Sequence, residues 1–232
     1  MTVDAIIAEL EQLANPEKVV FKQKKFGVIS QNALGIYHKD LKEIAKRIGK
    51  NNALAEELFD TNIYEARLLC SKLFKPKDLT EALMEKWVVT FENWEICDSF
   101  SMGIFAKSTL AIPKILEWNT RSREFEKRAS FATIAAYCMA DKKADNTVFE
   151  QFFPLIHQAA NDERIYVKKA VNWALRNIGK RNIDLNKRAI EEAHKIEALE
   201  YKSAKWIARD ALRALQKEVI NILDYPRAIY RL

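Results

Sequence analysis

EKRASFATIAAY, at residues 126–137, is the first of three similar stretches, followed by YVKKAVNWALRN at 166–177 and SAKWIARDALRA at 203–214. Each is rich in alanine and carries basic residues near its start. Each follows another amphipathic segment, in turn STLAIPKILEW, NTVFEQFFPLIHQAA and IDLNKRAIEEAHKIEAL. A unit of two helices that recurs about every 40 residues is typical of HEAT or armadillo repeats. The small residues of the second helix allow neighbouring units to stack closely.

The rest of the chain also has helical periodicity. Its five glycines and five prolines fall between the periodic segments, and no stretch alternates apolar and polar residues around a Gly or Asn turn. The repeats share little identity, which favours an irregular array over a regular solenoid. The sequence therefore predicts an all-α fold, an α-α superhelix of HEAT/armadillo-like helical repeats, as one domain over residues 1–232.

Composition narrows the class of protein. Hydrophobic residues make up 49% of the chain, yet no apolar run approaches the ~18 residues of a membrane span. The N-terminal stretch has acids within its apolar part and no basic start, so we expect no signal peptide. The cysteines and histidines are scattered, so we expect no disulfide framework, no metal site and no cofactor, in a reducing cytoplasm. These residues are Cys70, Cys97, Cys138, His38, His157 and His194.

The charge points to an anionic partner. The formal net charge is +6, which favours nucleic acid, although many unrelated proteins share such an excess. A stack of helical repeats has a concave face lined by the second helix of each unit. A basic lining on that face would suit a DNA duplex.

The stretch NWEICD begins a helix with two unusual side chains. Asn93 can act as the N-cap, so the helix is predicted to run from Trp94 to about Lys107. Trp94 and Asp98 share one face, because residues i and i+4 are neighbours, and that face is not the core face. They are either a site or a solvated acid beside a tryptophan that packs on an adjacent helix. The predicted core stripe is Ile96, Cys97, Phe100 and Ile104.

Trp173 also lies off the apolar stripe of its helix. It shares its side of the helical wheel with Lys169, Arg176 and Lys180. One interpretation is a stacking or cation–π surface beside phosphate-binding charges. The other is an aromatic that covers a groove between repeats while lysine stems extend around it.

Arg128 has the opposite position, inside the small and apolar stripe of its helix. A guanidinium there needs a carboxylate or a phosphate, because an unpaired buried charge is very costly. It is either part of an internal arginine ladder between stacked repeats or a bidentate phosphate contact on the concave face.

NWEICD, EKRA and KKAVNWALR resemble three signature segments of the alkylpurine DNA glycosylases built from HEAT-like repeats, the AlkD family. LANPEKVVFKQKKFGV and NALGIYHKDLKEIAK resemble that family's opening segments. The resemblance covers roughly residues 5 to 215 and leaves the tail NILDYPRAIYRL unassigned.

The resemblance implies a role for each of four residues. Asp98 would be the catalytic aspartate and Trp94 its partner, while Arg128 and Trp173 would be the site arginine and second site tryptophan. One departure is Asn93, where the best-known members have another aromatic, so the shape of the aromatic cleft is open.

The implied activity is excision of purines alkylated at N3 or N7 from duplex DNA, without a cofactor. We expect the protein to act as a monomer, and to be associated with the nucleoid when bound to DNA. The cations expected to contact phosphates are Lys168, Lys169, Arg176 and Lys180. Two alternatives stay open, a non-catalytic DNA binder of the same fold and a protein-interaction scaffold.

Overall fold

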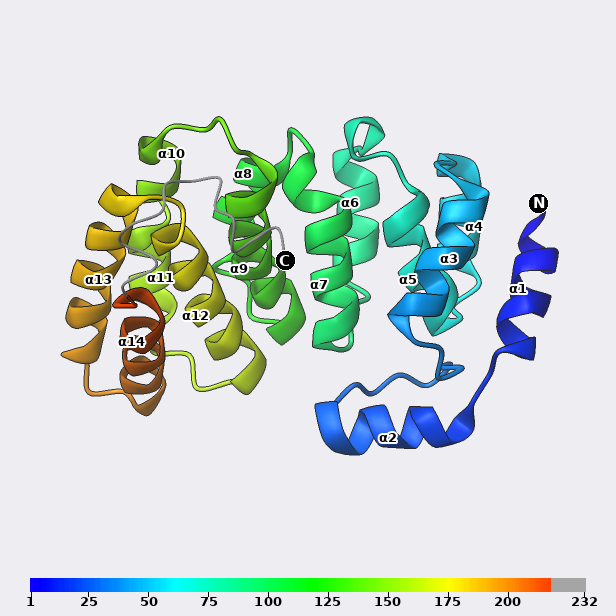
Figure 1. Cartoon of the computed structure of the whole chain (residues 1–232), viewed down its shortest axis with the longest axis horizontal. Coiled ribbons are helices and arrows are strands. Elements are labelled where there is room, and N and C mark those ends of the chain that lie inside the picture. Colours follow the sequence, from blue (N-terminus) through cyan, green and yellow to red (C-terminus); the bar gives the residue numbers. More distant parts are fainter. Residues whose placement is uncertain (218–232) are drawn as a thin grey trace. The chain divides into compact units, whose positions relative to one another are not determined.

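The computed structural model describes residues 1–217, and no strand occurs among them. The chain forms two compact units, the first Met1–Thr109 and the second beginning at Leu110 (Figure 1). The predicted all-α fold is confirmed. The prediction of one domain over the whole chain stays a prediction, and the unassigned tail lies outside the described residues.

The first unit consists of helices joined by short loops. Its elements are α1 (Val3–Gln12), α2 (Pro16–Phe26), α3 (His38–Ile48), α4 (Asn52–Asp60), α5 (Tyr64–Leu73), η1 (Pro76–Asp78), α6 (Glu81–Val88), α7 (Trp94–Gly103) and η2 (Phe105–Lys107). Helix α5 lies at the centre of this unit, where it packs against α3, α4 and α7. Helix α7 carries Trp94 and Asp98, two of the candidate site residues.

Local sequence signals explain where several helices begin. The side chain before the first turn accepts a hydrogen bond from a first-turn backbone N–H, which satisfies a group that the helix leaves unpaired. The residues that do this are Thr2, Asn15, Asn51, Thr80, Asn93 and Asn182. Helix α2 also has Pro16 in its first turn and is followed by the C-cap residue Gly27, whose φ of 66° suits glycine.

An aromatic cluster forms the core of the first unit. The ring of Phe100, from α7, packs against the rings of Phe59, Trp87, Phe91 and Phe105, with centroids 5.2 to 5.8 Å apart. Such tilted and edge-on contacts stabilise a core beyond the area that they bury. Phe100 thus anchors the buried side of α7 and fixes which side of the helix faces outward.

The second unit has the predicted pairs of helices. Its elements are α8 (Ala111–Trp118), α9 (Glu124–Ala140), α10 (Asn146–Glu150), α11 (Phe153–Ala159), α12 (Ile165–Gly179), α13 (Ile183–Glu197) and α14 (Lys202–Leu215). Helix α12 packs between α9 and α14, and these three form one layer. Helices α8, α11 and α13 pack behind α9, α12 and α14 respectively. This two-layer stack is the HEAT-like arrangement that the sequence predicts.

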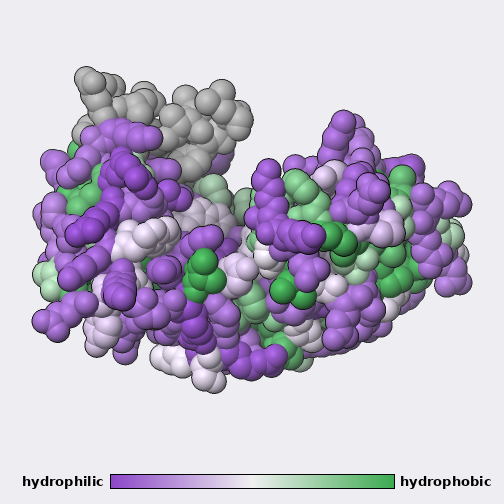
Figure 2. Space-filling model, turned by 90° about the horizontal axis from the view of Figure 1, so that it is seen from below, coloured by the Kyte–Doolittle hydropathy of each residue, from purple (hydrophilic) through white to green (hydrophobic). Residues whose placement is uncertain are grey.

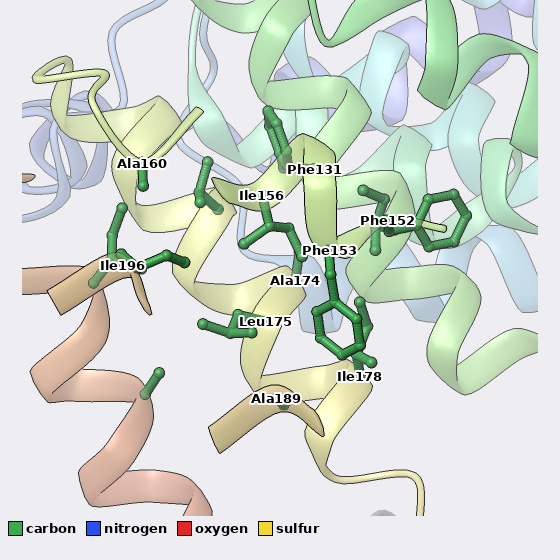
Figure 3. Packing of buried hydrophobic residues seen from close by; sticks show 14 of the residues in the cluster. Phe131, Phe152, Phe153, Ile156, Ala160, Ala174, Leu175, Ile178, Ala189 and Ile196 are labelled. Carbon is green, nitrogen blue, oxygen red and sulfur yellow. The ribbon is translucent and has the colours of Figure 1, made fainter. Parts of the chain in front are cut away.

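Small residues set the spacing of the stacked helices. Ala170 and Ala174 of α12 are fully buried, as are Ala204 and Ala208 of α14. A Cβ atom added at Gly179 would lie 2.7 Å from side-chain atoms of Ala189 and Leu215, so no larger residue fits there. Leucine, isoleucine and phenylalanine side chains of α9, α11 and α12 fill the space between the two layers (Figure 3).

Buried polar side chains join neighbouring repeats through backbone carbonyl groups. Asn177 of α12 donates to the Ala135 carbonyl at 2.9 Å, and Asn172 donates to the Ile207 carbonyl at 3.0 Å. Arg181 is buried and donates to the Asp141 carbonyl at 2.8 Å. These bonds pair buried donors and hold α12 in register with the helices on either side.

Two helix boundaries differ from the predictions. Helix α7 ends at Gly103, and residues up to Lys107 form a 3₁₀ turn, because Gly103 is a poor helix former that lies against the Ser71 carbonyl. The segment 146–160 forms two helices instead of one. Pro154, at the start of α11, has no N–H and its ring would collide with the Glu150 carbonyl of a continuous helix.

Candidate nucleic-acid interface

The start of α7 is fixed by Asn93. Its Oδ1 accepts hydrogen bonds from the backbone N–H groups of Glu95 and Ile96 at 3.0 and 3.1 Å, and its Nδ2 donates to the Ile29 carbonyl at 3.1 Å. The side chain is 1% exposed. An aromatic side chain has no short-reach oxygen that could accept the two first-turn N–H groups. The departure from the aromatic expected at this position therefore has a structural reason.

Trp94 follows directly and is half-buried. Its indole Nε1 donates to the Phe26 carbonyl, the last residue of α2, at 2.8 Å. This bond holds the indole ring in one orientation against the end of α2. This contact with the end of α2 is compatible with either interpretation of Trp94, as a site residue or as an aromatic that packs on an adjacent helix.

Asp98 lies one helical turn after Trp94 and is also half-buried. The core side of α7 is made by Ile96, Cys97 and Phe100, which are fully buried. Trp94 and Asp98 therefore share the side of α7 that faces away from the core, as the helical wheel predicts. The carboxylate therefore belongs to a residue one helical turn from an indole that is hydrogen-bonded to the end of α2.

A buried ionic network that the sequence did not predict fixes α2 on α7. Lys22 Nζ lies 2.6 Å from Glu95 Oε2, and Tyr64 donates to the same carboxylate at 2.8 Å. His38 Nε2 lies 3.2 Å from Glu95 Oε1. Burial alone would raise the pKa of Glu95, but hydrogen bonds from His38, Lys22 and Tyr64 lower that pKa to about 2. Glu95 is therefore ionised at neutral pH and keeps the Phe26 carbonyl beside Trp94.

The loop before α7 is held by Arg67 of α5. The Arg67 guanidinium donates to both carboxylate oxygens of Glu92, at 3.0 and 3.1 Å, and to the Thr90 carbonyl at 3.0 Å. A surface pocket lies next to these groups, and it is lined by Ile29, Ser30, Gln31, Asn32, Asn62, Arg67, Thr90 and Glu92. Arg67 thus holds Thr90 and Glu92 in place, and these two residues lie in the loop directly before α7.

Trp173 occupies the position predicted for it on α12. The indole is half-buried. The core stripe is fully buried, and it consists of Val167, Ala170, Val171, Ala174, Leu175 and Ile178. The core of the second unit thus leaves Trp173 outside it, which keeps both interpretations of this residue open.

The four predicted phosphate-binding cations all lie on or directly after α12, in different environments. Lys169 is exposed, and Lys168 Nζ lies 5.5 Å from the centre of the Trp206 ring of α14. Arg176 pairs with Asp210 of α14 at 3.3 Å, so part of its charge is already balanced. Of the four, Lys169 is exposed, and Lys168, Arg176 and Lys180 are half-buried.

Arg128 is buried on α9, with 5% of its surface exposed. Its Nη1 donates to the Tyr166 carbonyl, in the first turn of α12, at 2.6 Å. Arg128 therefore joins α9 to the start of the helix that carries Trp173. Its contact with a DNA phosphate stays a prediction from the resemblance.

The structure groups the four predicted site residues in pairs. Trp94 and Asp98 lie on α7 of the first unit, and Arg128 and Trp173 lie on the neighbouring helices α9 and α12 of the second. Hydrophilic residues cover most of the face drawn in Figure 2, and apolar residues form separate patches on it. Within residues 1–217, no group of three or more His, Cys, Asp or Glu side chains is placed to bind a metal ion. None of the helices in this range combines the length and the apolar character needed to cross a lipid bilayer.

Comparison with known proteins identifies the family. A curated relative from Listeria innocua, the uncharacterized protein Lin0241, is 24% identical over 199 residues, which cover 84% of this chain and 87% of the relative. A solved structure matches with a TM-score of 0.74 and 19% identity, over 92% of this chain and 95% of that one. It is described as "a new family of proteins related to the HEAT-like repeat DNA glycosylases with affinity for branched DNA structures". The family model "DNA alkylation repair enzyme" matches residues 6–215, so the chain belongs to the DNA alkylation repair enzyme family.

Proposed function

We propose that this protein is a DNA glycosylase that excises cationic N3- or N7-alkylated purines from duplex DNA. The observation that carries the proposal is the pair on α7, a half-buried carboxylate one turn from an indole whose orientation is fixed by the Phe26 carbonyl. Family membership supports the same class of substrate. A generic phosphate-binding surface has no use for an acid such as Asp98.

The proposed chemistry needs few groups. A purine alkylated at N3 or N7 carries a positive charge and is already a good leaving group, so no general acid has to protonate it. Positive charge then develops on the deoxyribose as the glycosidic bond breaks. Asp98 would stabilise that charge beside C1′ and orient the attacking water. One such electrostatic contact is worth about 3–4 kcal/mol of barrier.

Aromatic side chains would select the substrate by its charge. Trp94 is proposed to attract the cationic nucleoside through a cation–π contact, worth about 0.5–2 kcal/mol, and Trp173 is proposed as a second aromatic contact. A neutral base gains much less from either ring. Arg128 would contribute by holding the start of α12, because its guanidinium donates to the Tyr166 carbonyl.

Duplex binding would come from phosphate contacts. Lys168 and Lys169 are the proposed main contacts, and Arg176 and Lys180 are proposed to add to them. The expected partner is duplex DNA carrying alkylated bases, bound by a monomer in the cytoplasm.

A second candidate function is DNA binding without excision. The solved structure with the TM-score of 0.74 is described as having affinity for branched DNA and as related to glycosylases. Under this alternative the same fold would bind DNA without releasing a base, and Asp98→Asn would leave the DNA affinity unchanged.

The test compares a charged with a neutral lesion. The purified protein is incubated with a duplex containing one 7-methylguanine, and with the same duplex containing hypoxanthine or uracil in its place. The proposal predicts release of 7-methylguanine and little release of the neutral bases. Comparable rates for the two would contradict selection by charge, and binding with no release of 7-methylguanine would support the second candidate.

A further inference from the structure

Helix α14 carries an aromatic residue that its own core does not use. The stripe that packs against α12 and α13 is formed by Ala204, Ile207, Ala208, Ala211 and Leu215, all fully buried. Trp206 points away from this stripe and is 40% exposed. It lines a surface pocket along the outer side of the helix together with Lys202, Lys205, Arg209, Asp210 and Arg213.

The surroundings of Trp206 are cationic. The lining includes four lysine or arginine side chains and one acid, Asp210, which pairs with Arg213 and with Arg176. Lys168 of the neighbouring helix reaches over the Trp206 ring at 5.5 Å. Arg209 lies 3.5 Å from Glu197, at the edge of the pocket, and Lys202 and Lys205 are exposed. Glu163, which accepts a hydrogen bond from the Ser203 N–H at 3.0 Å, also interacts with Lys168 and Lys202. Cations therefore outnumber acids around this exposed indole.

An indole among exposed cations matches the chemistry of single-stranded nucleic acid. Proteins that bind single strands combine a cationic surface for the phosphates with aromatic rings on which unpaired bases stack. A base inside a duplex has both faces covered by its neighbours, so an indole cannot stack on it without unpairing it. Phosphate contacts alone would need no aromatic ring.

We propose that the pocket on α14 binds an unpaired nucleotide segment, whose base stacks on Trp206 while Lys202, Lys205 and Arg209 contact its phosphates. Lys168 reaches over the Trp206 ring and also belongs to the proposed duplex-binding side of α12, so the two contacts are adjacent. A duplex with a single-stranded end or branch would meet both. This binding needs no excision and no contribution from Asp98.

The test measures binding of a fluorescein-labelled 12-nucleotide thymidine strand, by fluorescence anisotropy. Trp206→Leu should bind this strand about 10-fold more weakly than the parent protein, because one base–aromatic stack is lost. Trp206→Phe, which keeps a ring, should bind within about 3-fold of the parent. Tyr201→Leu is the matched control, because Tyr201 is an exposed aromatic of the same region outside the pocket lining, and it should bind like the parent.

Two further ligands separate stacking from simple charge. A 12-nucleotide abasic strand has the phosphates without the bases, so Trp206→Leu and the parent should bind it equally. A blunt duplex should also bind both proteins equally. The double variant Lys202→Ala/Lys205→Ala should reduce the slope of log affinity against log salt for the thymidine strand by about 1.4, which is 0.7 per phosphate contact. Equal affinity of Trp206→Leu and the parent for the thymidine strand would overturn the proposal. A loss of affinity for the abasic strand in Trp206→Leu that equals its loss for the thymidine strand would also overturn it.

The same variants keep this inference distinct from the excision proposal. Trp206→Leu should release 7-methylguanine from a blunt duplex at the parent rate, and Asp98→Asn should bind the thymidine strand as the parent does. Loss of strand binding in Asp98→Asn would contradict the separation of the two sites.

Discussion

The buried carboxylate of Glu95 makes a prediction that is independent of any substrate. Glu95→Gln keeps the size of the side chain but removes the charge that pairs with Lys22 and receives hydrogen bonds from His38 and Tyr64. Lys22 is itself buried, so the variant leaves an ammonium group without its carboxylate. The cost of breaking such a pair is high because the remaining charge is not solvated.

The magnitude follows from the pKa of Glu95. That pKa falls from 4.5 to about 2 in the folded protein, and each unit corresponds to about 1.4 kcal/mol, so ionised Glu95 contributes about 3 kcal/mol at neutral pH. A lowered folded-state pKa means that this contribution is complete above pH 4.5 and is lost as the pH falls toward 2. At pH 3 about 1.4 kcal/mol should remain.

The assay is urea denaturation of the parent protein and of Glu95→Gln at pH 7 and pH 3. The free energy of unfolding of the variant should be lower by about 3 kcal/mol at pH 7, and the difference should shrink by about half at pH 3. Asp184→Asn, an exposed acid in the first turn of α13, is the control and should show a difference below about 1 kcal/mol at both pH values. A difference in free energy of unfolding between the parent and Glu95→Gln that is small at pH 7, or that does not shrink at pH 3, would refute the role of ionised Glu95 in holding α2 on α7.

Three further predictions concern the proposed site and its support. Replacing Trp94 or Trp173 with leucine should slow release of 7-methylguanine by about one order of magnitude, through loss of a cation–π contact, and single-turnover rates check this. Asn93→Ala should lower the free energy of unfolding by about 1–2 kcal/mol, because α7 loses its N-cap; an unchanged urea midpoint would argue against that role. Affinity for undamaged duplex should fall steeply with salt and show little sequence preference. Lys169→Ala should reduce the slope of log affinity against log salt by about 0.9, and an unchanged slope would exclude Lys169 from the phosphate contacts.

Helical periodicity made the outward positions predictable. Trp94, Asp98 and Trp173 lie off their core stripes in the structure because the same apolar spacing that forms a helix decides which side is buried. Trp206 could have been recognised in the same way, since it stands off the stripe of Ala204 and Ala208. The alanine-rich pattern of that helix predicts only that the helix packs closely against its neighbours.

Contacts between distant segments were not predictable. Lys22 and Glu95 are 73 residues apart in the chain, and no spacing or motif links them to Tyr64 or His38. Arg128 illustrates the same difficulty. Its position in the apolar stripe predicts that it needs a partner, but not that this partner is the Tyr166 carbonyl, 38 residues further along the chain. Helix boundaries also depended on tertiary contacts, as the close approach of Gly103 to Ser71 shows.

The most direct test of the central claim is the single-turnover rate of 7-methylguanine release by Asp98→Asn, measured beside the parent protein and Asp184→Asn on the same duplex. The account predicts that Asp98→Asn keeps the fold and most of the DNA affinity, yet releases the base about 10²–10³-fold more slowly, while Asp184→Asn matches the parent. Release by Asp98→Asn at the parent rate would contradict the account, because the carboxylate on α7 would then have no part in breaking the glycosidic bond.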